Sequence, residues 1–332
     1  MGVEVEVEGM TKSFGRHEIW SDVSFTLPPG EVSALLGPSG TGKSVFLKCM
    51  VGLLRPERGR CVVAGVDTVS CSRHDLYEVR KHFGVLFQDG ALFGSMTVYD
   101  NVAFPLREHT RKSERQIRDI VMDRMALVGL EGAEEKLPGE ISGGMKKRAG
   151  LARALVLEPE ILLCDEPDSG LDPVRTAYLS QLLIDINARL DTTILIVTHN
   201  INLARTVPDN VGMLFQRRLV GFGPRELMLT SDEPVIAQFL NGRRVGPIGM
   251  SEEKDAATAA AEQELAANGH SDGSTGEDMT ALVRQLQPTP GVGTRRAVGR
   301  RMNRLAGQLK DLPPERREVV VRALQAEQAG AA

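Results

Sequence analysis

Residues 37–44 decide the fold of this chain, and they read Gly37-Pro38-Ser39-Gly40-Thr41-Gly42-Lys43-Ser44. An apolar run over 32–36 precedes this octet, and a helix-competent run over 45–53 follows it. In such a strand–loop–helix setting the glycines let backbone N–H groups surround phosphate oxygens, and the helix adds the positive end of its dipole. Lys43 can neutralise phosphate charge, and the Ser44 hydroxyl can ligate Mg²⁺. The octet therefore predicts a P-loop that binds a nucleoside triphosphate.

Length and composition narrow the class of protein. With 332 residues, 42% of them hydrophobic, the chain is expected to form one large soluble domain and a smaller one. A formal net charge of -4 argues against a nucleic-acid partner for the whole chain, but not against a local basic patch. The apolar runs are far shorter than the about 18 residues of a membrane span, and the start lacks a signal-peptide pattern. The four cysteines are expected to be buried thiols of a cytoplasmic protein.

Residues 1 to about 243 alternate short β-like runs with helical runs, which is typical of an α/β domain. Strands are predicted over 3–7, 23–27, 32–36, 60–64, 83–87, 161–164 and 193–198, with 211–215 as an edge strand. The pattern between 88 and 157 is helical, with its longest helix over 113–128 and another from Gly143 onward. This stretch is predicted to be a helical insertion between two core strands.

The composition changes near residue 250. Residues 249–273 are predicted to form a flexible linker, because they are rich in Glu, Ala, Asp and Ser and almost lack large apolar residues. A small helical module is predicted over 274–328, with its first helix carrying Met279, Leu282, Val283 and Leu286 on one face. The second stripe is Val298, Met302, Leu305 and Leu309, and the third helix begins at Pro313–Pro314 and carries Val320, Ala323 and Leu324. So small a module is expected to dock onto something.

Two carboxylates follow the apolar run 161–164. Asp165 is suited to hold Mg²⁺ through water, as acidic residues do at the end of a core strand in P-loop enzymes. Glu166 would then stand at the carboxyl end of that strand, where it can accept a hydrogen bond from an attacking water molecule. The alternative is that the two residues form an ordinary solvated turn.

A second phosphate-binding pattern lies at Ser142-Gly143-Gly144-Met145, at the start of a predicted helix. One nucleotide does not need two such sites on one chain, but in a symmetric dimer each can serve the partner's nucleotide. The set resembles the nucleotide-binding subunits of ATP-binding cassette (ABC) transporters, in which this stretch is the signature motif that contacts the γ-phosphate across the dimer.

Other segments match further motifs of that family in the same order. Phe14 occupies the position of the aromatic ring that stacks on adenine, with plain core packing as the alternative. Gln88 matches the Q-loop, Asp172 the D-loop, and His199 the switch histidine near the γ-phosphate, with a structural histidine as its alternative. The resemblance implies an α/β P-loop ATPase domain over 1–248. Within it are expected a mixed sheet core, a β-subdomain and a helical insertion at about 89–157, followed by the small helical module.

The resemblance also implies a set of functional residues. The catalytic residues would be Glu166, His199 and Gln88. ATP would be bound by Phe14, Gly37, Pro38, Ser39, Gly40, Thr41, Gly42, Lys43, Ser44 and Val45, and in the opposite subunit by Ser142, Gly143, Gly144 and Met145. Mg²⁺ would be held by Ser44, Gln88 and Asp165. The implied reaction is ATP hydrolysis, with ATP and Mg²⁺ as the bound species.

Two departures from the common pattern suggest a subgroup, namely Met145 where Gln is usual and the domain end Gln238–Ile248. Asp168 after the strand carboxylates, together with the long C-terminal tail, adds to this resemblance. These features resemble the ATPases of Mce-type lipid transporters. That resemblance implies a homodimer at the cytoplasmic face of the plasma (inner) membrane, beneath separate permease subunits and Mce-domain proteins. The cargo would be fatty acids, sterols or phospholipids, and the direction import. The alternative is an importer of amino acids or another polar solute.

Two surfaces are predicted to contact partners. A groove for the permease is expected after the Q-loop, lined by Phe87, Leu92, Phe93, Met96 and Val98, unless these residues pack the core of the insertion. The tail is expected to embrace the second ATPase, to bind a regulator, or to contact anionic lipid heads through Arg295, Arg296, Arg300, Arg301 and Arg304. A solvated helix face is the alternative explanation of these arginines.

A GTPase is disfavoured, because the chain lacks the guanine-reading Asn-Lys-x-Asp motif.

Overall fold

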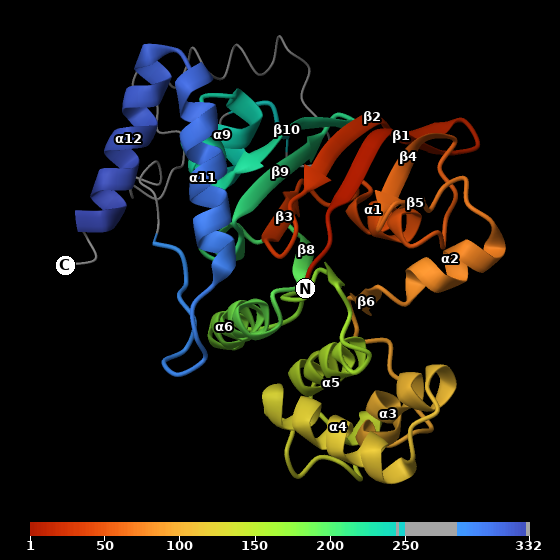
Figure 1. Cartoon of the computed structure of the whole chain (residues 1–332). Helices are drawn as coiled ribbons and strands as arrows, with labels where there is room; N and C mark the ends of the chain where they lie inside the picture. Colours follow the sequence, from red (N-terminus) through yellow and green to blue (C-terminus); the bar gives the residue numbers. More distant parts are fainter. Residues whose placement is uncertain (244–245, 250–283, 330–332) are drawn as a thin grey trace.

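The computed structural model describes residues 1–243, 246–249 and 284–329. A core of two sheets carries a helical lobe, at the bottom of Figure 1, and a pair of C-terminal helices, at its left. The chain has a mixed α/β fold with C-terminal helices, as predicted from the sequence. Among the described residues, no helix is long and apolar enough to cross a membrane.

The larger sheet has the strand order β10-β9-β3-β8-β7-β6. Its parallel strands are β3 (Val32–Leu36), β6 (Phe83–Leu86), β7 (Ile161–Asp165), β8 (Thr193–Thr198) and β9 (Asn210–Phe215). The strands β3, β7, β8 and β9 are buried along their whole length, which explains why their sequences are almost continuously apolar. All five strands had been predicted within a few residues of these bounds.

The prediction that 211–215 is an edge strand is wrong. The antiparallel strand β10 (Arg218–Pro224) pairs with β9 on its outer side. β10 shows no alternating pattern in the sequence, because it contains Gly221 and Gly223 and its register shifts between Leu219 and Gly221.

The smaller antiparallel sheet has the order β2-β1-β4-β5. Its strands are β1 (Val5–Phe14), β2 (His17–Leu27), β4 (Arg58–Val63) and β5 (Val66–Asp67). β1 extends well beyond the predicted 3–7, with irregular pairing after Val7. The helix α1 (Lys43–Met50) shares a buried cluster with both sheets, in which Phe46 packs against Trp20 and Phe25. The first helix after the P-loop is therefore held by aromatic packing.

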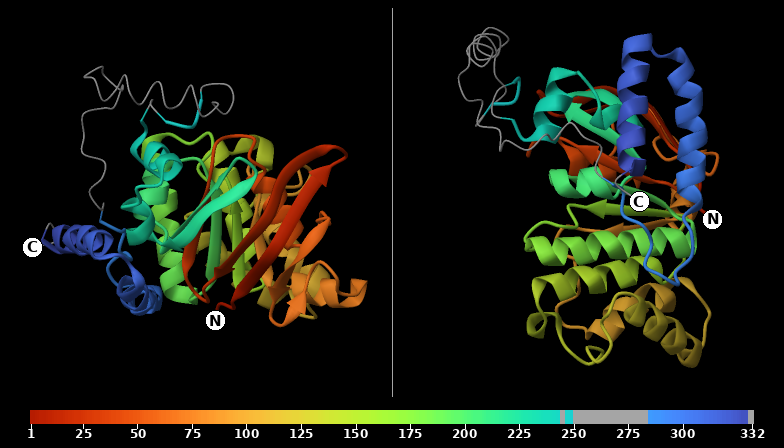
Figure 2. Two further views of the ribbon diagram at one scale, coloured as in Figure 1. Left: turned by 90° about the horizontal axis from the view of Figure 1, so that it is seen from above. Right: turned by 90° about the vertical axis from the view of Figure 1, so that its left-hand side faces the viewer.

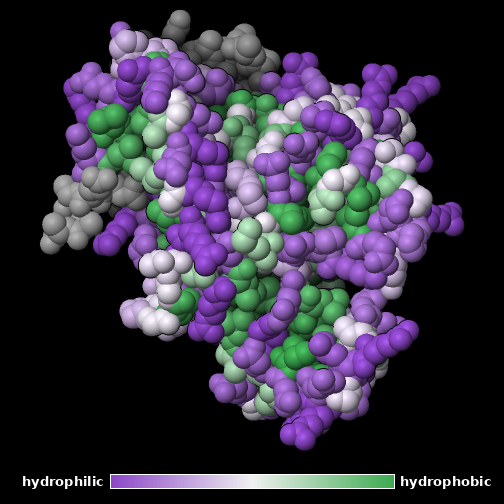
Figure 3. Space-filling view, in the orientation of Figure 1, coloured by the Kyte–Doolittle hydropathy of each residue, from purple (hydrophilic) through white to green (hydrophobic). Residues whose placement is uncertain are grey.

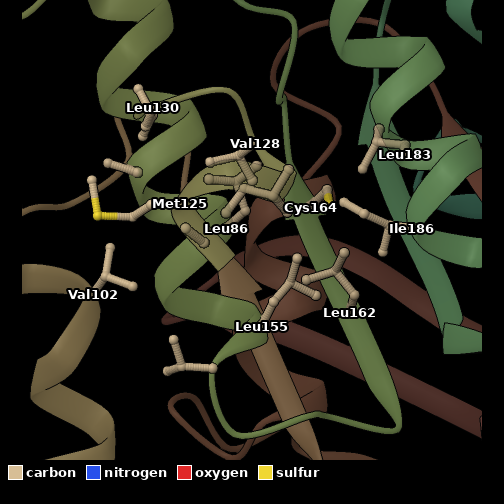
Figure 4. Packing of buried hydrophobic residues seen from close by; sticks show 14 of the residues in the cluster. Leu86, Val102, Met125, Val128, Leu130, Leu155, Leu162, Cys164, Leu183 and Ile186 are labelled. Carbon is tan, nitrogen blue, oxygen red and sulfur yellow. The ribbon is translucent and has the colours of Figure 1, made fainter. Parts of the chain in front are cut away.

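The helical lobe comprises α3 (Val98–His109), α4 (Glu114–Leu127) and α5 (Gly143–Leu155), with a 3₁₀ turn at Pro138–Glu140; α2 (Arg73–Arg80) lies closer to the small sheet. α4 begins with a capping box in which Ser113 and Gln116 satisfy each other's backbone N–H groups. Figure 4 shows Met125, Val128 and Leu155 beside Leu86 and Leu162 of the large sheet. One buried cluster thus joins the lobe to β6 and β7.

The carboxyl-terminal part of the core contains α6 (Pro173–Leu190), α7 (Ile201–Thr206), α8 (Arg225–Leu229) and α9 (Pro234–Asn241). Beyond it, α11 (Arg296–Asp311) and α12 (Pro314–Ala329) lie side by side near α9 (Figures 1 and 2). On the face shown in Figure 3, the region of α11 is largely hydrophilic. The second and third predicted helices thus exist, and Val320 is buried as expected.

Little of the predicted linker and of the first predicted helix lies within the described residues. Most of the predicted linker 249–273 and the residues Met279, Leu282 and Val283 lie outside the described residues. The last residue of the first predicted stripe, Leu286, is not helical, and its N–H donates to the carbonyl of Thr206. The following Pro288 and Pro290 disfavour a helix at this point.

The cysteines are free, and Cys49, Cys61 and Cys164 are buried as predicted, whereas Cys71 is half-buried.

Candidate nucleotide site

The P-loop connects β3 to α1 and is held in place by close packing. Gly42 caps α1 with φ 84°, a left-handed conformation that favours glycine. A Cβ at this position would lie 2.2 Å from Cγ2 of Ile19, and the Gly42 carbonyl accepts a hydrogen bond from the indole of the buried Trp20 at 3.4 Å. A larger residue at 42 would therefore displace the loop.

Lys43 is a buried cation within this loop. Its Nζ donates to the carbonyl oxygens of Gly37 at 2.8 Å and Pro38 at 2.9 Å. Burial lowers the pKa of Lys43, while the carboxylates of Glu166 and Asp165 act in the opposite direction. The loop thus holds a positive charge at the centre of the predicted phosphate site, balanced by two nearby carboxylates.

Asp165 ends β7 beside the start of α1. Its Oδ1 accepts a hydrogen bond from the Ser44 hydroxyl at 2.7 Å. Burial raises the pKa of Asp165, and the hydrogen bond from Ser44 opposes that rise. A hydroxyl next to a carboxylate suits a hard cation such as Mg²⁺, which takes oxygen ligands and keeps bound water. In the described part of the chain no three His, Cys, Asp or Glu side chains form a metal cluster, so other ligands would have to be phosphate, water or amide oxygens.

Glu166 and His199 come together from adjacent parallel strands. The Nδ1 atom of His199, just after β8, lies 3.4 Å from Oε1 of Glu166, just after β7. Glu166 has φ 43°, a conformation that is strained for a residue with a side chain, and its N–H donates to the Val197 carbonyl at 2.9 Å. The exposed imidazole and the half-buried carboxylate therefore lie next to each other at the carboxyl edge of the sheet.

The loop after Glu166 is held by two buried polar side chains whose contacts the sequence did not reveal. Asp168 is buried and accepts a hydrogen bond from the Thr198 hydroxyl at 2.9 Å, which links this loop to the residue before His199. Lys147 of α5 is also buried, and its Nζ donates to the carbonyl oxygens of Glu166 and Ser169. A helical-wheel reading could have found Lys147, because it shares a face of α5 with the buried Leu151.

Gln88 lies at the solvent side of this region. It follows β6, it is exposed, and its Nε2 lies 3.4 Å from the Ser169 hydroxyl as a hydrogen-bond donor. The Q-loop position is thus brought beside the segment that contains Glu166. Among the described residues, Gln88 forms no hydrogen bond with Asp165 or Ser44.

Ser142 and Asp172 are both helix caps. The Ser142 hydroxyl accepts the N–H of Met145 at 3.3 Å at the start of α5, and Asp172 accepts the N–H of Arg175 at 2.9 Å at the start of α6. Ser142, Gly143 and Asp172 are exposed. Across the described ranges, no hydrogen bond or ion pair joins 142–145 to the P-loop. Within one chain, neither kind of contact therefore connects this second phosphate-binding pattern to the P-loop.

Phe14 projects from the end of β1 and is 48% exposed. The alternative of plain core packing is therefore wrong for this residue. The Nζ of Lys12 lies 5.0 Å from the centre of its ring, a cation–π contact on a ring that is otherwise open to solvent.

The C-terminal arginines contact the core rather than solvent. Arg295 and Arg301 are buried and bond the carboxylate of Asp209, at the amino end of β9; the Arg301 bond measures 2.9 Å. Arg300 bonds Asp191, and Arg304 bonds Glu31. A solvated face is therefore wrong for α11, and of the five arginines only Arg296 is exposed.

The buried face of α11 differs from the predicted stripe for the same reason. It consists of Ala297, Arg301 and Leu305. The arginine is buried because it forms an ion pair with Asp209 of the core, at the amino end of β9. Val298, Met302 and Leu309 are half-buried at its flanks. These contacts occupy four of the arginines that had been considered for anionic lipid heads.

Comparisons with known proteins identify the family. A family model described as ABC transporter matches residues 20–169. The chain is 66% identical over 321 residues to Mkl of Mycobacterium tuberculosis, described as a probable ribonucleotide transport ATP-binding protein, covering 97% of this chain and 89% of Mkl. It is 37% identical over 244 residues to MlaF of Escherichia coli, described as an intermembrane phospholipid transport system ATP-binding protein, covering 74% and 91% respectively.

Solved structures agree with this relationship. The dimeric structure of MJ0796, a bacterial ABC transporter cassette, aligns with a TM-score of 0.63 at 28% identity, over 67% of this chain and 98% of that one. A post-hydrolysis state of the same cassette, bound to ADP and Pi, aligns with a TM-score of 0.62. The chain therefore belongs to the ABC transporter family, as an ATPase subunit built on the ATP-binding cassette.

Proposed function

We propose that this ABC ATPase dimerises around two ATP molecules and powers the transport of lipid through separate permease subunits. The observation that carries the ATPase part is the meeting of Lys43, Asp165 and Glu166 at one edge of the sheet, with His199 beside Glu166. The lipid part rests on the relationship to MlaF. The proposal places the dimer at the cytoplasmic face of the plasma (inner) membrane.

The roles of the residues follow from their charges and positions. The N–H groups of 37–45 would surround the β- and γ-phosphates, with Lys43 neutralising their charge and Phe14 stacking on adenine. Ser44 and Asp165, with Gln88 near the exposed side, would hold Mg²⁺, which neutralises phosphate charge when bound. Glu166 would orient the attacking water molecule and accept its proton, and His199 would contact the γ-phosphate.

The proposal needs a second copy of the chain. A helix N-terminus is formed by Ser142, Gly143, Gly144 and Met145, and among the described residues no hydrogen bond or ion pair joins it to the P-loop of the same chain. In a two-fold dimer this surface would face the partner's nucleotide. The 98% coverage of the dimeric MJ0796 cassette supports this arrangement. After hydrolysis and release of phosphate, the bridge between Lys43 and the partner's signature motif is lost and the dimer can open.

Replacing Lys43 with alanine should weaken ATP binding by about tenfold or more, because it removes a charge-assisted contact from a partly dry loop. Isothermal titration calorimetry with ATP measures this. The matched control is Lys48→Ala, since Lys48 lies on the same helix but is exposed. Equal ATP affinity of the Lys43→Ala variant and the wild type would disprove the assigned role.

A groove on the helical lobe is suited to a permease. It has a volume of about 450 Å³ and is lined by aromatic residues that include Phe87, Phe93 and Phe104. Phe93 is 44% exposed and packs on Phe104 with ring centroids 5.0 Å apart. Of the five residues predicted for this groove, only Phe87 and Phe93 line it. Val98 is buried and Leu92 packs on the lobe core, so these two residues belong to the core of the insertion, which was the alternative. Met96 is half-buried.

Replacing Phe93 with aspartate should prevent assembly with membrane subunits, because it removes the exposed ring that packs on Phe104 and puts a carboxylate in its place. ATP affinity of the isolated chain should stay unchanged. Co-purification of the tagged variant from detergent-solubilised native membranes measures assembly. Leu137→Asp is the control, since Leu137 is another exposed hydrophobic residue of the same lobe. Normal assembly of the Phe93→Asp complex would reject this groove as the docking site.

The cargo has a second candidate. Mkl, at 66% identity, is described as a ribonucleotide transport protein, which keeps a polar solute open as the alternative. Transport of lipid through Mce-domain partners predicts lipid in the purified complex. Import of a polar solute such as amino acids or ribonucleotides predicts instead a dedicated solute-binding protein.

A further inference from the structure

A cavity lies between α6 and the helical lobe, next to the segment 142–145 that we propose faces the partner's nucleotide. It has a volume of about 510 Å³, within the range of small-molecule sites. One wall comes from the end of α4 and the start of α5, and the other from Leu171 and α6. Its apolar lining includes Leu127, Met145, Leu171, Leu179 and Leu182.

The charged residues of this cavity are all basic. Lys147, Arg148 and Arg175 line it, and no carboxylate is among its described lining residues. Lys147 is engaged with the carbonyl oxygens of Glu166 and Ser169, and Arg175 pairs with the exposed Asp172 at 3.2 Å. Two of the three cations thus already have partners.

Arg148 differs from the other two. Its Nη1 donates to the carbonyl oxygens of Val128 at 3.0 Å and Gly129 at 2.6 Å, which are neutral acceptors. No carboxylate of the described residues forms an ion pair with it. Burial lowers the pKa of Arg148, and the nearby charge of Arg175 lowers it further. A half-buried guanidinium without a counter-charge at an apolar cavity favours an anionic group.

We propose that this cavity binds a small amphipathic anion, a medium-chain carboxylate, with its head at Arg148 and its chain among the leucines. Such an occupant would bridge α5 and α6 beside Ser142, which also lines the cavity. It would restrain the signature segment relative to the core and so slow ATP turnover. The effect on turnover rests on the proposed role of the signature segment, whereas the binding itself does not, and neither depends on the cargo.

Octanoate and 1-octanol test the site, because they share a chain and differ in the charge of the head group. Calorimetry on the full-length protein should show octanoate binding about tenfold tighter than 1-octanol. The Arg148→Gln variant should lose about tenfold in octanoate affinity, with little change for 1-octanol. Val174→Ser, on α6 but outside the cavity and 65% exposed, should bind octanoate like the wild type.

A second variant keeps the test decisive if Arg148→Gln does not fold. Leu182→Phe fills the cavity without altering its charge, and it should reduce the binding of both compounds. Octanoate should also slow ATP hydrolysis in the wild type and not in Leu182→Phe. Octanoate affinity unchanged by both Arg148→Gln and Leu182→Phe, or the absence of octanoate binding to the wild type, would overturn the proposal and leave the lipid-transport function untouched.

Discussion

The Glu166→Gln variant is expected to bind ATP like the wild type and to hydrolyse it about 100-fold more slowly or worse. Glutamine keeps the size of the side chain, but its amide cannot take a proton from the attacking water. Because Lys43, Ser44 and Asp165 are unchanged, the nucleotide should still be held. ATP should then accumulate in a closed dimer. Phosphate release measures turnover, and size-exclusion chromatography with light scattering measures the dimer.

A matched control separates catalysis from loss of charge on the same strand. Glu158 lies just before β7, whereas Glu166 lies just after it. Glu158 is exposed and pairs with Arg124 at 2.9 Å, a surface contact that contributes little to stability. Glu158→Gln should therefore hydrolyse ATP at the wild-type rate. Wild-type turnover by Glu166→Gln would remove Glu166 from the reaction and with it the assignment of the base.

The Asp209→Ala variant should lose about 3–5 kcal/mol of folding stability. Asp209 is fully buried and accepts hydrogen bonds from Arg295 and Arg301 of the C-terminal part, as well as from the N–H of Val32 at 2.9 Å. Removing this carboxylate leaves the buried Arg295 without its ion-pair partner and leaves Arg301 with only Glu226, at 3.2 Å, which is costly in a dry environment. Urea unfolding at pH 7 measures the free-energy difference.

Asp232 provides the control for this prediction. It is exposed and lies 3.8 Å from Arg316 of α12, so it joins the same two parts of the chain without being buried. Asp232→Ala should change stability by less than about 1 kcal/mol. Equal effects of the two variants would mean that burial of the Asp209 network does not contribute to anchoring the tail.

The sequence was sufficient to predict the parallel core and the P-loop, because fully buried strands are continuously apolar and a loop that encloses phosphate needs glycines at fixed positions. β3 and β8 were predicted with their observed bounds. The neighbourhood of Asp165, Glu166 and His199 was also predictable, since the carboxyl ends of parallel strands meet at one edge of a sheet.

Other features depended on tertiary contacts that no local pattern carries. β10 contains two glycines, so its sequence does not predict a strand. Its hydrogen bonds with β9 hold it in the strand conformation. Arg301 looked like a solvent-exposed residue because arginine usually is, and only the fold brings Asp209 to it. The links from Lys147 and Thr198 to the loop after Glu166 likewise join segments that are apart in the sequence.

The composition of the complex trapped with ATP tests the proposed lipid transport most directly. Tagged Glu166→Gln protein would be purified from native membranes of the source organism with ATP and Mg²⁺, and its proteins and lipids identified by mass spectrometry. We expect two copies of this chain with permease subunits, Mce-domain proteins and bound lipid. A permease with a solute-binding protein for a polar solute, and no enriched lipid, would contradict lipid transport.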